Sequence, residues 1–399
     1  MLNITDLKEE LTLTPILRLG FRPLFLFGSL FAFLAMLIWL LTLSGQLSFS
    51  PVNGVFWWHS HEMLFGFVPA IIASFLLTAV QTWTNIPSIK GNKLLFLSLI
   101  WLLPRTLLAF NPDINLLFTM TADLAFLPLT ALLLAVPLIK IRQYRNLVFV
   151  PVLLLMTTAN VLTYLPQFDF SASLATQGFH GMVLLVTFLV AFLGGRVIPM
   201  FTANGTSTAK VSPLKWLEIL ALLSIVILFG LIISGLTHNQ WLLAILCFSS
   251  ALLNLIRQLR WRPWVTLKVP LVWSLHFAMI FAPIGLLLMG IHFIFGSISL
   301  STALHSLTVG LIGGMISAMT ARVSLGHTGR KLKVGHIMQL AFMAIILSAL
   351  TRSLLVALWP QYSLQFWLVS AVLWCITFGS FVALYLPILS APRIDGRPG

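Results

Sequence analysis

Residues 21–43 read FRPLFLFGSLFAFLAMLIWLLTL, and this stretch decides the class of fold. It contains 23 residues with one charged side chain, that of Arg22 near its start. A helix rises about 1.5 Å per residue, so a run of this length crosses the roughly 30 Å hydrocarbon core of a bilayer. No small-residue cleavage site follows it, which predicts a retained transmembrane helix and not a signal peptide.

The composition of the whole chain also indicates a membrane protein. Of its 399 residues, 59% are hydrophobic and 8% are charged, whereas about 25% of the residues in a water-soluble globule are charged. The net charge of +14 is gathered in short loops between apolar runs, which is typical of membrane orientation and not of nucleic-acid binding. Cys247 and Cys375 lie inside apolar runs, so the sequence offers neither a disulfide framework nor a cysteine-rich metal site.

Apolar runs long enough to span the bilayer recur along the chain. They predict an all-α bundle of about twelve transmembrane helices, forming a single transmembrane domain over residues 1–399 with no soluble domain. The approximate spans are residues 21–43, 60–82, 94–110, 114–139, 147–166, 177–199, 214–236, 240–259, 271–295, 300–321, 334–358 and 364–389.

Basic residues are confined to alternate loops of this arrangement, together with both chain ends. The loops on the opposite side contain neither lysine nor arginine. The positive-inside rule therefore predicts that both termini are cytoplasmic. The basic residues on the predicted cytoplasmic side include Lys90, Lys93, Lys140, Arg142, Arg145, Lys210, Lys215, Arg257, Arg260, Arg262, Lys268, Arg330, Lys331, Lys333, Arg393 and Arg397.

Weak internal similarity suggests three quasi-repeats of four helices, near residues 15–145, 146–262 and 263–390. The second, sixth and tenth predicted helices each begin on the outer side with histidine: His59 and His61, His180, and His305. The third and eleventh helices each carry one arginine at a similar depth, Arg105 and Arg352. Gly310 and Gly314, four residues apart on the tenth helix, are expected to allow close helix packing.

The outer histidines are candidate ligands for a metal ion or for haem iron, because neutral imidazole is the commonest metal ligand in proteins and the usual axial ligand of haem. Arg105 and Arg352 are candidate partners for haem propionates, since a guanidinium pairs with a carboxylate in a bidentate manner. Two alternatives stay open. The histidines would also suit an interfacial position, and Arg105 would equally pair with Asp123 on the adjacent helix.

The positions of the other histidines refine this hypothesis. His59 and His61 lie about 200° apart on an ideal helix, so the two side chains are expected to serve different sites. His238 and His292 are predicted to be interfacial.

A second polar group is predicted near the cytoplasmic face. It comprises His276, Arg196, Arg322 and the loop LGHTGR at residues 325–330, which contains His327 and Arg330. Glycines in that loop would let backbone amides approach an anion, although such a loop is more often a simple turn.

Several segments resemble the signature segments of the NnrS family, in the expected order and over almost the whole chain. They are LRLGFRPLF at 17–25, WHSHEMLFG at 58–66, GGRVIPMFT at 194–202, LHSLTVG at 304–310 and LGHTGR at 325–330. The resemblance implies a bacterial inner-membrane protein that contains haem and copper and is linked to nitric oxide metabolism and resistance to nitrosative stress. It also marks a set of motif residues: His59, His61, Glu62, His180, His276, His305, His327 and Arg330.

These observations lead to one functional hypothesis and one rival. Haem held by outer histidines, including His61 and His305, would bind or convert nitric oxide or a derivative, with copper at His59 or His180. The protein would then be a haem-dependent oxidoreductase, a sensor or a maintenance factor, served by an electron donor that the sequence does not identify. The rival is a transporter of a small solute or metal complex without haem, which repeats and intramembrane arginines also fit.

Overall fold

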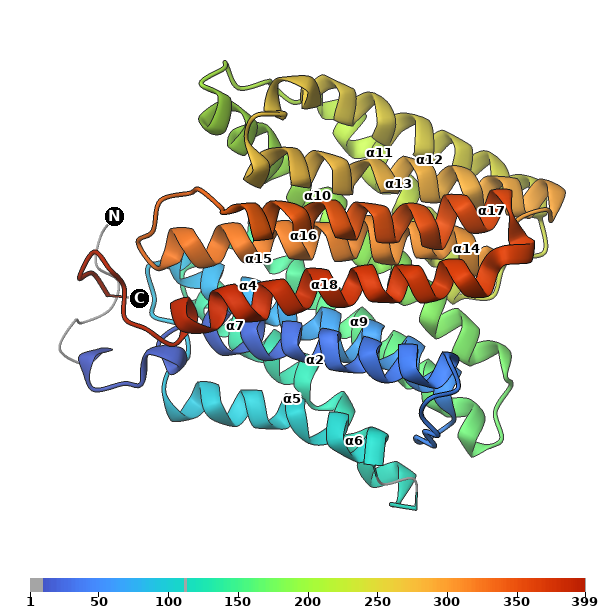
Figure 1. Ribbon diagram of the computed structural model, residues 1–399, viewed down its shortest axis with the longest axis horizontal. Coiled ribbons are helices and arrows are strands. Elements are labelled where there is room, and N and C mark those ends of the chain that lie inside the picture. Colours follow the sequence, from blue (N-terminus) through green and yellow to red (C-terminus); the bar gives the residue numbers. More distant parts are fainter. Residues whose placement is uncertain (1–9, 111–112, 399) are drawn as a thin grey trace. The chain divides into compact units, whose positions relative to one another are not determined.

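The computed structural model describes residues 10–110 and 113–398, and those residues form helices and no strands. Twelve helices are long and apolar enough to span a membrane, which confirms the predicted all-helical class. The chain divides into two compact units, and the helices named below are labelled in Figure 1 where there is room. The first unit comprises the described residues up to Phe179, Arg322–Leu332 and those from Phe378 onward. The second unit comprises His180–Ala321 and Lys333–Thr377.

The first unit is built mainly from the N-terminal half of the chain. Its elements are η1 (Pro15–Leu17), α2 (Phe21–Leu43), α3 (Val55–His61), η2 (Glu62–Phe67), α4 (Val68–Thr84), α5 (Asn92–Phe110), α6 (Leu116–Leu124), α7 (Phe126–Lys140), α8 (Tyr144–Leu147), α9 (Phe149–Tyr164) and η3 (Leu165–Phe168).

The second unit contains most of the C-terminal half. Its elements are α11 (Lys215–Ile233), α12 (Gln240–Arg260), η4 (Pro263–Thr266), α13 (Pro270–Phe295), α14 (Leu300–His305), η5 (Ser306–Gly313), α16 (His336–Ala349), η6 (Leu350–Leu355), α17 (Val356–Leu358) and η7 (Pro360–Tyr362). Three of the four unit boundaries fall inside further helices: α10 (Ser173–Thr206), α15 (Gly314–His327) and α18 (Ser363–Leu389). The division into three four-helix repeats stays a prediction.

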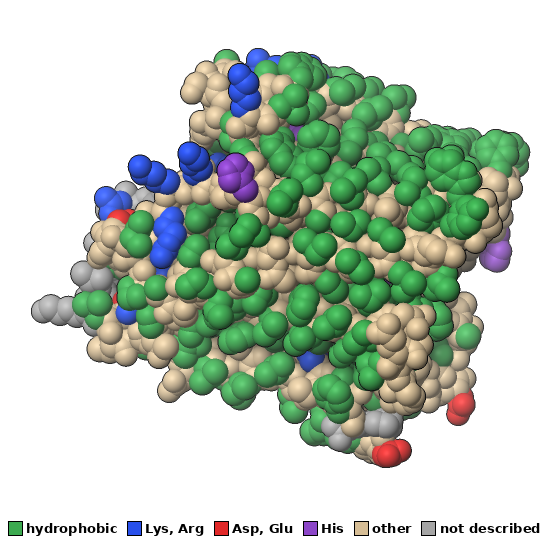
Figure 2. Space-filling model, viewed as in Figure 1, with side chains coloured by type: hydrophobic (Ala, Val, Ile, Leu, Met, Phe, Trp, Pro, Cys, Tyr) green, Lys and Arg blue, Asp and Glu red, His purple; other side chains and the backbone are tan. Residues whose placement is uncertain are grey.

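The outward sides of the helices are apolar. Leu220, Ile245 and Leu340 leave 45, 58 and 67% of their surface exposed, respectively. On the face drawn in Figure 2, hydrophobic side chains cover the lengths of the helices and most lysines and arginines lie near the helix ends. Such a surface suits lipid, because hydrocarbon contact costs apolar side chains nothing.

Polar side chains in each unit satisfy backbone groups that a helix leaves unpaired. In the first unit, α2 packs against α4, and the Phe21 N–H at the start of α2 donates to Thr78 Oγ1 over 3.0 Å. In the second unit, Pro283 has no N–H to donate to the Met279 carbonyl one turn earlier in α13. Gln258 of the adjacent α12 supplies the missing donor, with Nε2 2.7 Å from that oxygen.

Small residues permit close packing within the second unit, as predicted for the tenth helix. A Cβ atom at Gly310 would collide with the Phe281 ring, and one at Gly314 would lie 2.8 Å from the Ala278 Cβ. Both contacts join the tenth transmembrane helix to α13, so the packing role predicted for Gly310 and Gly314 is confirmed.

Candidate functional site

Three transmembrane helices contain a π-helical segment, and each segment contains or directly follows a predicted site residue. The π-helix η2 (Glu62–Phe67) begins after His61, and η5 (Ser306–Gly313) begins after His305. The third, η6 (Leu350–Leu355), contains Arg352. Segments of this type are rare and frequently mark functional sites, because they change the direction in which side chains leave the helix.

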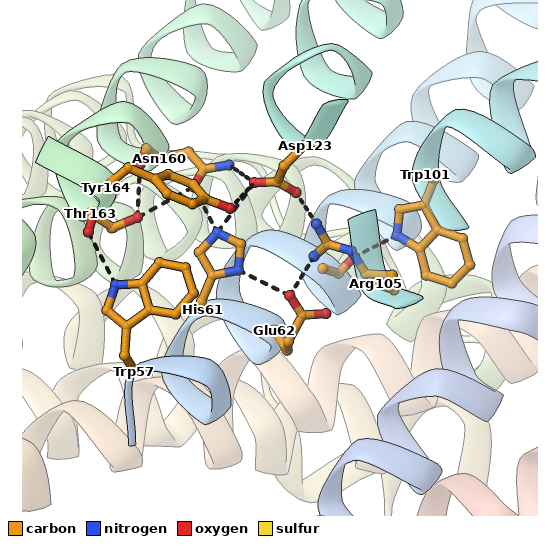
Figure 3. A network of polar contacts seen from close by, with 10 residues as sticks. Trp57, His61, Glu62, Trp101, Arg105, Asp123, Asn160, Thr163 and Tyr164 are labelled. Atoms are coloured by element: carbon orange, nitrogen blue, oxygen red, sulfur yellow. Dashed lines mark hydrogen bonds and ion pairs between the residues drawn. The ribbon is translucent and has the colours of Figure 1, made fainter. Parts of the chain in front are cut away.

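A buried polar network surrounds His61 in the first unit (Figure 3). His61 is fully buried, and its ring lies between two hydrogen-bond acceptors. Nδ1 is 3.0 Å from Glu62 Oε1, and Nε2 is 2.9 Å from Asn160 Oδ1. Nε2 also lies 3.2 Å from Asp123 Oδ2. Both ring nitrogens are thus committed to contacts inside the protein.

Arg105 connects the two carboxylates of this network. Its Nη1 lies 3.0 Å from Glu62 Oε1, and its Nη2 forms an ion pair with Asp123 Oδ1. Because all three side chains are at most 6% exposed, these charges interact without much screening. The predicted alternative in which Arg105 pairs with Asp123 is confirmed, and Glu62 is a second partner.

Asn160 and Tyr164, both on α9, hold Asp123 in place. Asn160 Nδ2 donates to Asp123 Oδ2 over 2.6 Å, and the Tyr164 hydroxyl donates to the same oxygen over 3.2 Å. Since the Asn160 amide nitrogen faces Asp123, its oxygen must face His61. Each ring nitrogen of His61 therefore faces acceptor oxygens: Glu62 Oε1 at Nδ1, and Asn160 Oδ1 with Asp123 Oδ2 at Nε2.

The backbone makes room for this network at Gly66, one turn after Glu62. A Cβ atom there would lie 2.5 Å from Arg105 Nη1 and 3.0 Å from Glu62 Oε2. The Gly66 carbonyl accepts a hydrogen bond of 2.8 Å from Trp101 Nε1. The π-helix and its glycine therefore position the arginine between its two carboxylates.

His59 and His61 face different neighbours, as their spacing predicts. His59 stacks on Trp39 of α2, with ring centroids 4.1 Å apart. The ring of His61 stacks on Trp57 at 4.4 Å, and Trp57 Nε1 donates to the Thr163 carbonyl over 3.1 Å. Only His61 belongs to the buried network.

The second unit contains the other predicted ligands. His305 is half-buried, and its Nδ1 lies 2.7 Å from the Ser301 carbonyl oxygen. That contact requires the proton to be on Nδ1, which leaves the lone pair of a neutral ring on Nε2. His180 is also half-buried and makes no hydrogen bond to another described residue.

Arg352 differs from Arg105 in having no acidic partner among the described residues. Its guanidinium lies over the Trp367 ring, 4.9 Å from the centroid. Nη1 is buried and has no hydrogen-bond partner in the described part of the chain. A buried guanidinium in this state favours an anion.

The outer histidines are divided between the units. His59 and His61 belong to the first unit, and His180 and His305 to the second. Within the described ranges, no group of three or more histidine, cysteine, aspartate or glutamate side chains is arranged to hold a metal ion.

The polar residues predicted near the cytoplasmic face belong to both units. In the second unit, His276 Nε2 lies 2.8 Å from Thr202 Oγ1, and the Arg196 guanidinium lies 4.0 Å from the Phe192 ring centroid. Arg322 belongs to the first unit and is 9% exposed.

The LGHTGR loop in the first unit is a helix C-cap. Gly329 has a φ of 75°, its N–H donates to the Gly326 carbonyl, and the Arg330 N–H donates to the Leu325 carbonyl. These are the two bonds of a Schellman motif. Both amides therefore donate to carbonyls of the last helical turn. In this structure the loop has the form of the simple turn, one of the two alternatives predicted for it.

The fold and this geometry define an integral membrane protein with many spans and a buried ionic network. The NnrS protein family model matches residues 15–393, so the chain belongs to the NnrS family, which is linked to nitric oxide metabolism. The comparison with curated proteins gave no match.

Proposed function

We propose that this protein binds haem and copper and uses them to bind or process nitric oxide or a derivative during nitrosative stress. The observation that carries the proposal is the contact between His305 Nδ1 and the Ser301 carbonyl oxygen, at 2.7 Å. Histidines that ligate a metal commonly donate their other ring N–H to a backbone carbonyl, which fixes the tautomer and the ring orientation. Membership in the NnrS family supports the same function.

The donor set favours the second unit as the haem site. His305 Nδ1 lies against a backbone carbonyl, as in many metal-ligating histidines, and Arg352 Nη1 has no hydrogen-bond partner among the described residues, which suits a propionate. The elements that carry them, α14 and η6, are in contact. In the first unit, His61 has both nitrogens engaged and Arg105 already has two carboxylate partners, so that pair fits haem poorly.

Copper is proposed at His59 or at His180, as two alternatives. His180 and His59 are both half-buried, His180 near the start of α10 and His59 in α3. Haem iron and copper, when bound, would supply a centre that binds nitric oxide and exchanges electrons. The chain's own part is to hold that centre in an apolar bundle, which an uncharged ligand reaches through lipid.

The membrane location completes the proposal. We infer the inner membrane of a bacterium, with both termini in the cytoplasm, from the family resemblance and from the distribution of basic loop residues. If an electron donor reduces the bound haem, the protein would act as an oxidoreductase; the type of donor is not specified.

An optical spectrum of the purified protein tests the proposal. We expect a Soret band that shifts on reduction with dithionite and again on addition of nitric oxide, together with copper in elemental analysis. His305→Ala should abolish or shift the band, whereas His238→Ala, in an exposed loop, should leave it unchanged. A protein purified intact from haem-replete cells without a Soret band would favour the rival transporter function.

A further inference from the structure

A stripe of polar side chains runs along the buried face of α12 in the second unit. Ser250, Asn254, Arg257 and Gln258 are at most 4% exposed. Leu252, on the opposite face of the same helix, is 58% exposed. Polar residues are expensive inside a membrane, so a buried stripe of this kind calls for a function.

Asn254, Arg257 and Gln258 each form hydrogen bonds with some of their polar atoms. Each also has one buried polar atom with no hydrogen-bond partner among the described residues. Asn254 Nδ2 donates to the Ser250 carbonyl over 2.9 Å, and Gln258 Nε2 donates to the Met279 carbonyl over 2.7 Å. Because those partners are acceptors, the amide nitrogens must face them. The atoms left without a described partner are therefore the acceptors Asn254 Oδ1 and Gln258 Oε1.

Arg257 contributes the matching donor. Its Nε lies 2.9 Å from Glu218 Oε2, and its Nη2 donates to the Ala191 carbonyl over 2.8 Å. Nη1 is buried without a described partner. Residues three and four apart on a helix are neighbours, so this donor and the two acceptors belong to one face.

We propose that this face of α12 binds a short chain of water molecules that opens to the aqueous phase beside Glu218. Water donates and accepts, as the two oxygens and the Nη1 group require, and buried waters commonly occupy such positions. The Glu218 carboxylate neutralises Arg257, so the site favours water over an ion. Glu218 is the partly exposed member, with 23% of its side-chain surface accessible.

The water chain reaches well into the helix bundle. Ser224 lies six residues beyond Glu218 on α11, which is about 9 Å along the helix axis. Its hydroxyl lies 2.9 Å from that of Ser250, so the polar stripe continues across to α11 at this level. The site thus provides a hydrated route from the helix end toward the interior of the second unit.

Cysteine accessibility tests the proposal in membrane vesicles. In a Cys247→Ala/Cys375→Ala background, Asn254→Cys and the matched control Leu252→Cys are exposed to aqueous silver nitrate, and the remaining thiols are then counted with a fluorescent maleimide after denaturation. We expect the thiol at position 254 to react at least tenfold faster than the one at 252. Equal rates at the two positions would overturn the proposal.

A second measurement needs no substitution near the site. Hydroxyl radicals generated by X-rays from bound water should oxidise Trp261, whose ring lies 5.0 Å from the Arg257 guanidinium carbon. Trp374 is the control in the same unit, because the two tryptophans are similarly buried, at 4 and 5% exposure. We expect at least fivefold faster oxidation of Trp261, and equal oxidation would show that the α12 face is dry.

Discussion

Glu62 Oε1 lies 3.0 Å from Nη1 of Arg105, and the same oxygen lies 3.0 Å from Nδ1 of His61. One carboxylate oxygen thereby links two residues that the sequence presented as separate haem partners. In the first unit both residues contact carboxylates, so the charge of Arg105 is compensated within this network by Glu62 and Asp123. Removing any one of them leaves the others uncompensated in a membrane interior.

Replacing Arg105 by methionine should be strongly destabilising. The variant leaves Glu62 and Asp123 without the guanidinium that both contact, and breaking a buried pair costs about 3–5 kcal/mol. Thermal unfolding of the detergent-solubilised protein would measure the loss. The double variant Arg105→Met/Asp123→Asn removes one charge of each sign and should be more stable than Arg105→Met alone. A double variant no more stable than the single one would contradict this account of the network.

Gly66→Ala should disturb the same network from the backbone. The added methyl group would lie 2.5 Å from Arg105 Nη1, and overpacking of this kind typically costs about 1–3 kcal/mol. Gly230→Ala on α11 is the control, because nothing lies within 4 Å of its added Cβ. We expect a lower unfolding temperature for Gly66→Ala and an unchanged or higher one for Gly230→Ala.

Gln258→Leu should expose the defect that Pro283 creates in α13. The Met279 carbonyl would lose its donor, at a cost of about 1–3 kcal/mol for a buried unsatisfied group. Adding Pro283→Ala to that variant supplies a backbone N–H at the right position and should recover part of the loss. If Pro283→Ala gave no recovery, the Gln258 contact would not be compensating for the proline.

Ser348 and Ser370 should behave as a coupled pair between α16 and α18. Ser348 Oγ donates to the Ser370 carbonyl over 2.8 Å, and Ser370 Oγ donates to the Ser348 carbonyl over 3.0 Å. Each single change to alanine should cost roughly 1 kcal/mol. The double change should cost less than the sum of the two, and strict additivity in unfolding measurements would exclude coupling.

The helices were predictable because length and hydropathy are sufficient to recognise a membrane span. The pairing of Arg105 with Asp123 could also be predicted from the sequence as one of two alternatives. The constant rise per residue of a helix places both side chains at a similar depth. Asn160 and Tyr164 were missed, although an asparagine within the apolar run at 147–166 was a usable signal.

The arrangement around His61 could not be predicted, because it depends on which faces of α6 and α9 turn toward α3. The division of the outer histidines between two units also has no signal in the sequence. Three histidines at similar helix starts predict similar depth, but depth alone does not predict the neighbours of each side chain.

The π-helix that begins at Glu62 has a consequence for the rest of its span. An α-helix turns about 100° per residue, so deleting a single residue between Glu62 and Phe67 to restore regular α-helix would rotate everything beyond it by nearly a third of a turn. Ala70 and Ala73, now fully buried, would swing away from the first unit's interior while His61 stayed in place. The extra residue therefore sets the rotation between the ionic N-terminal part of this helix and its closely packed C-terminal part.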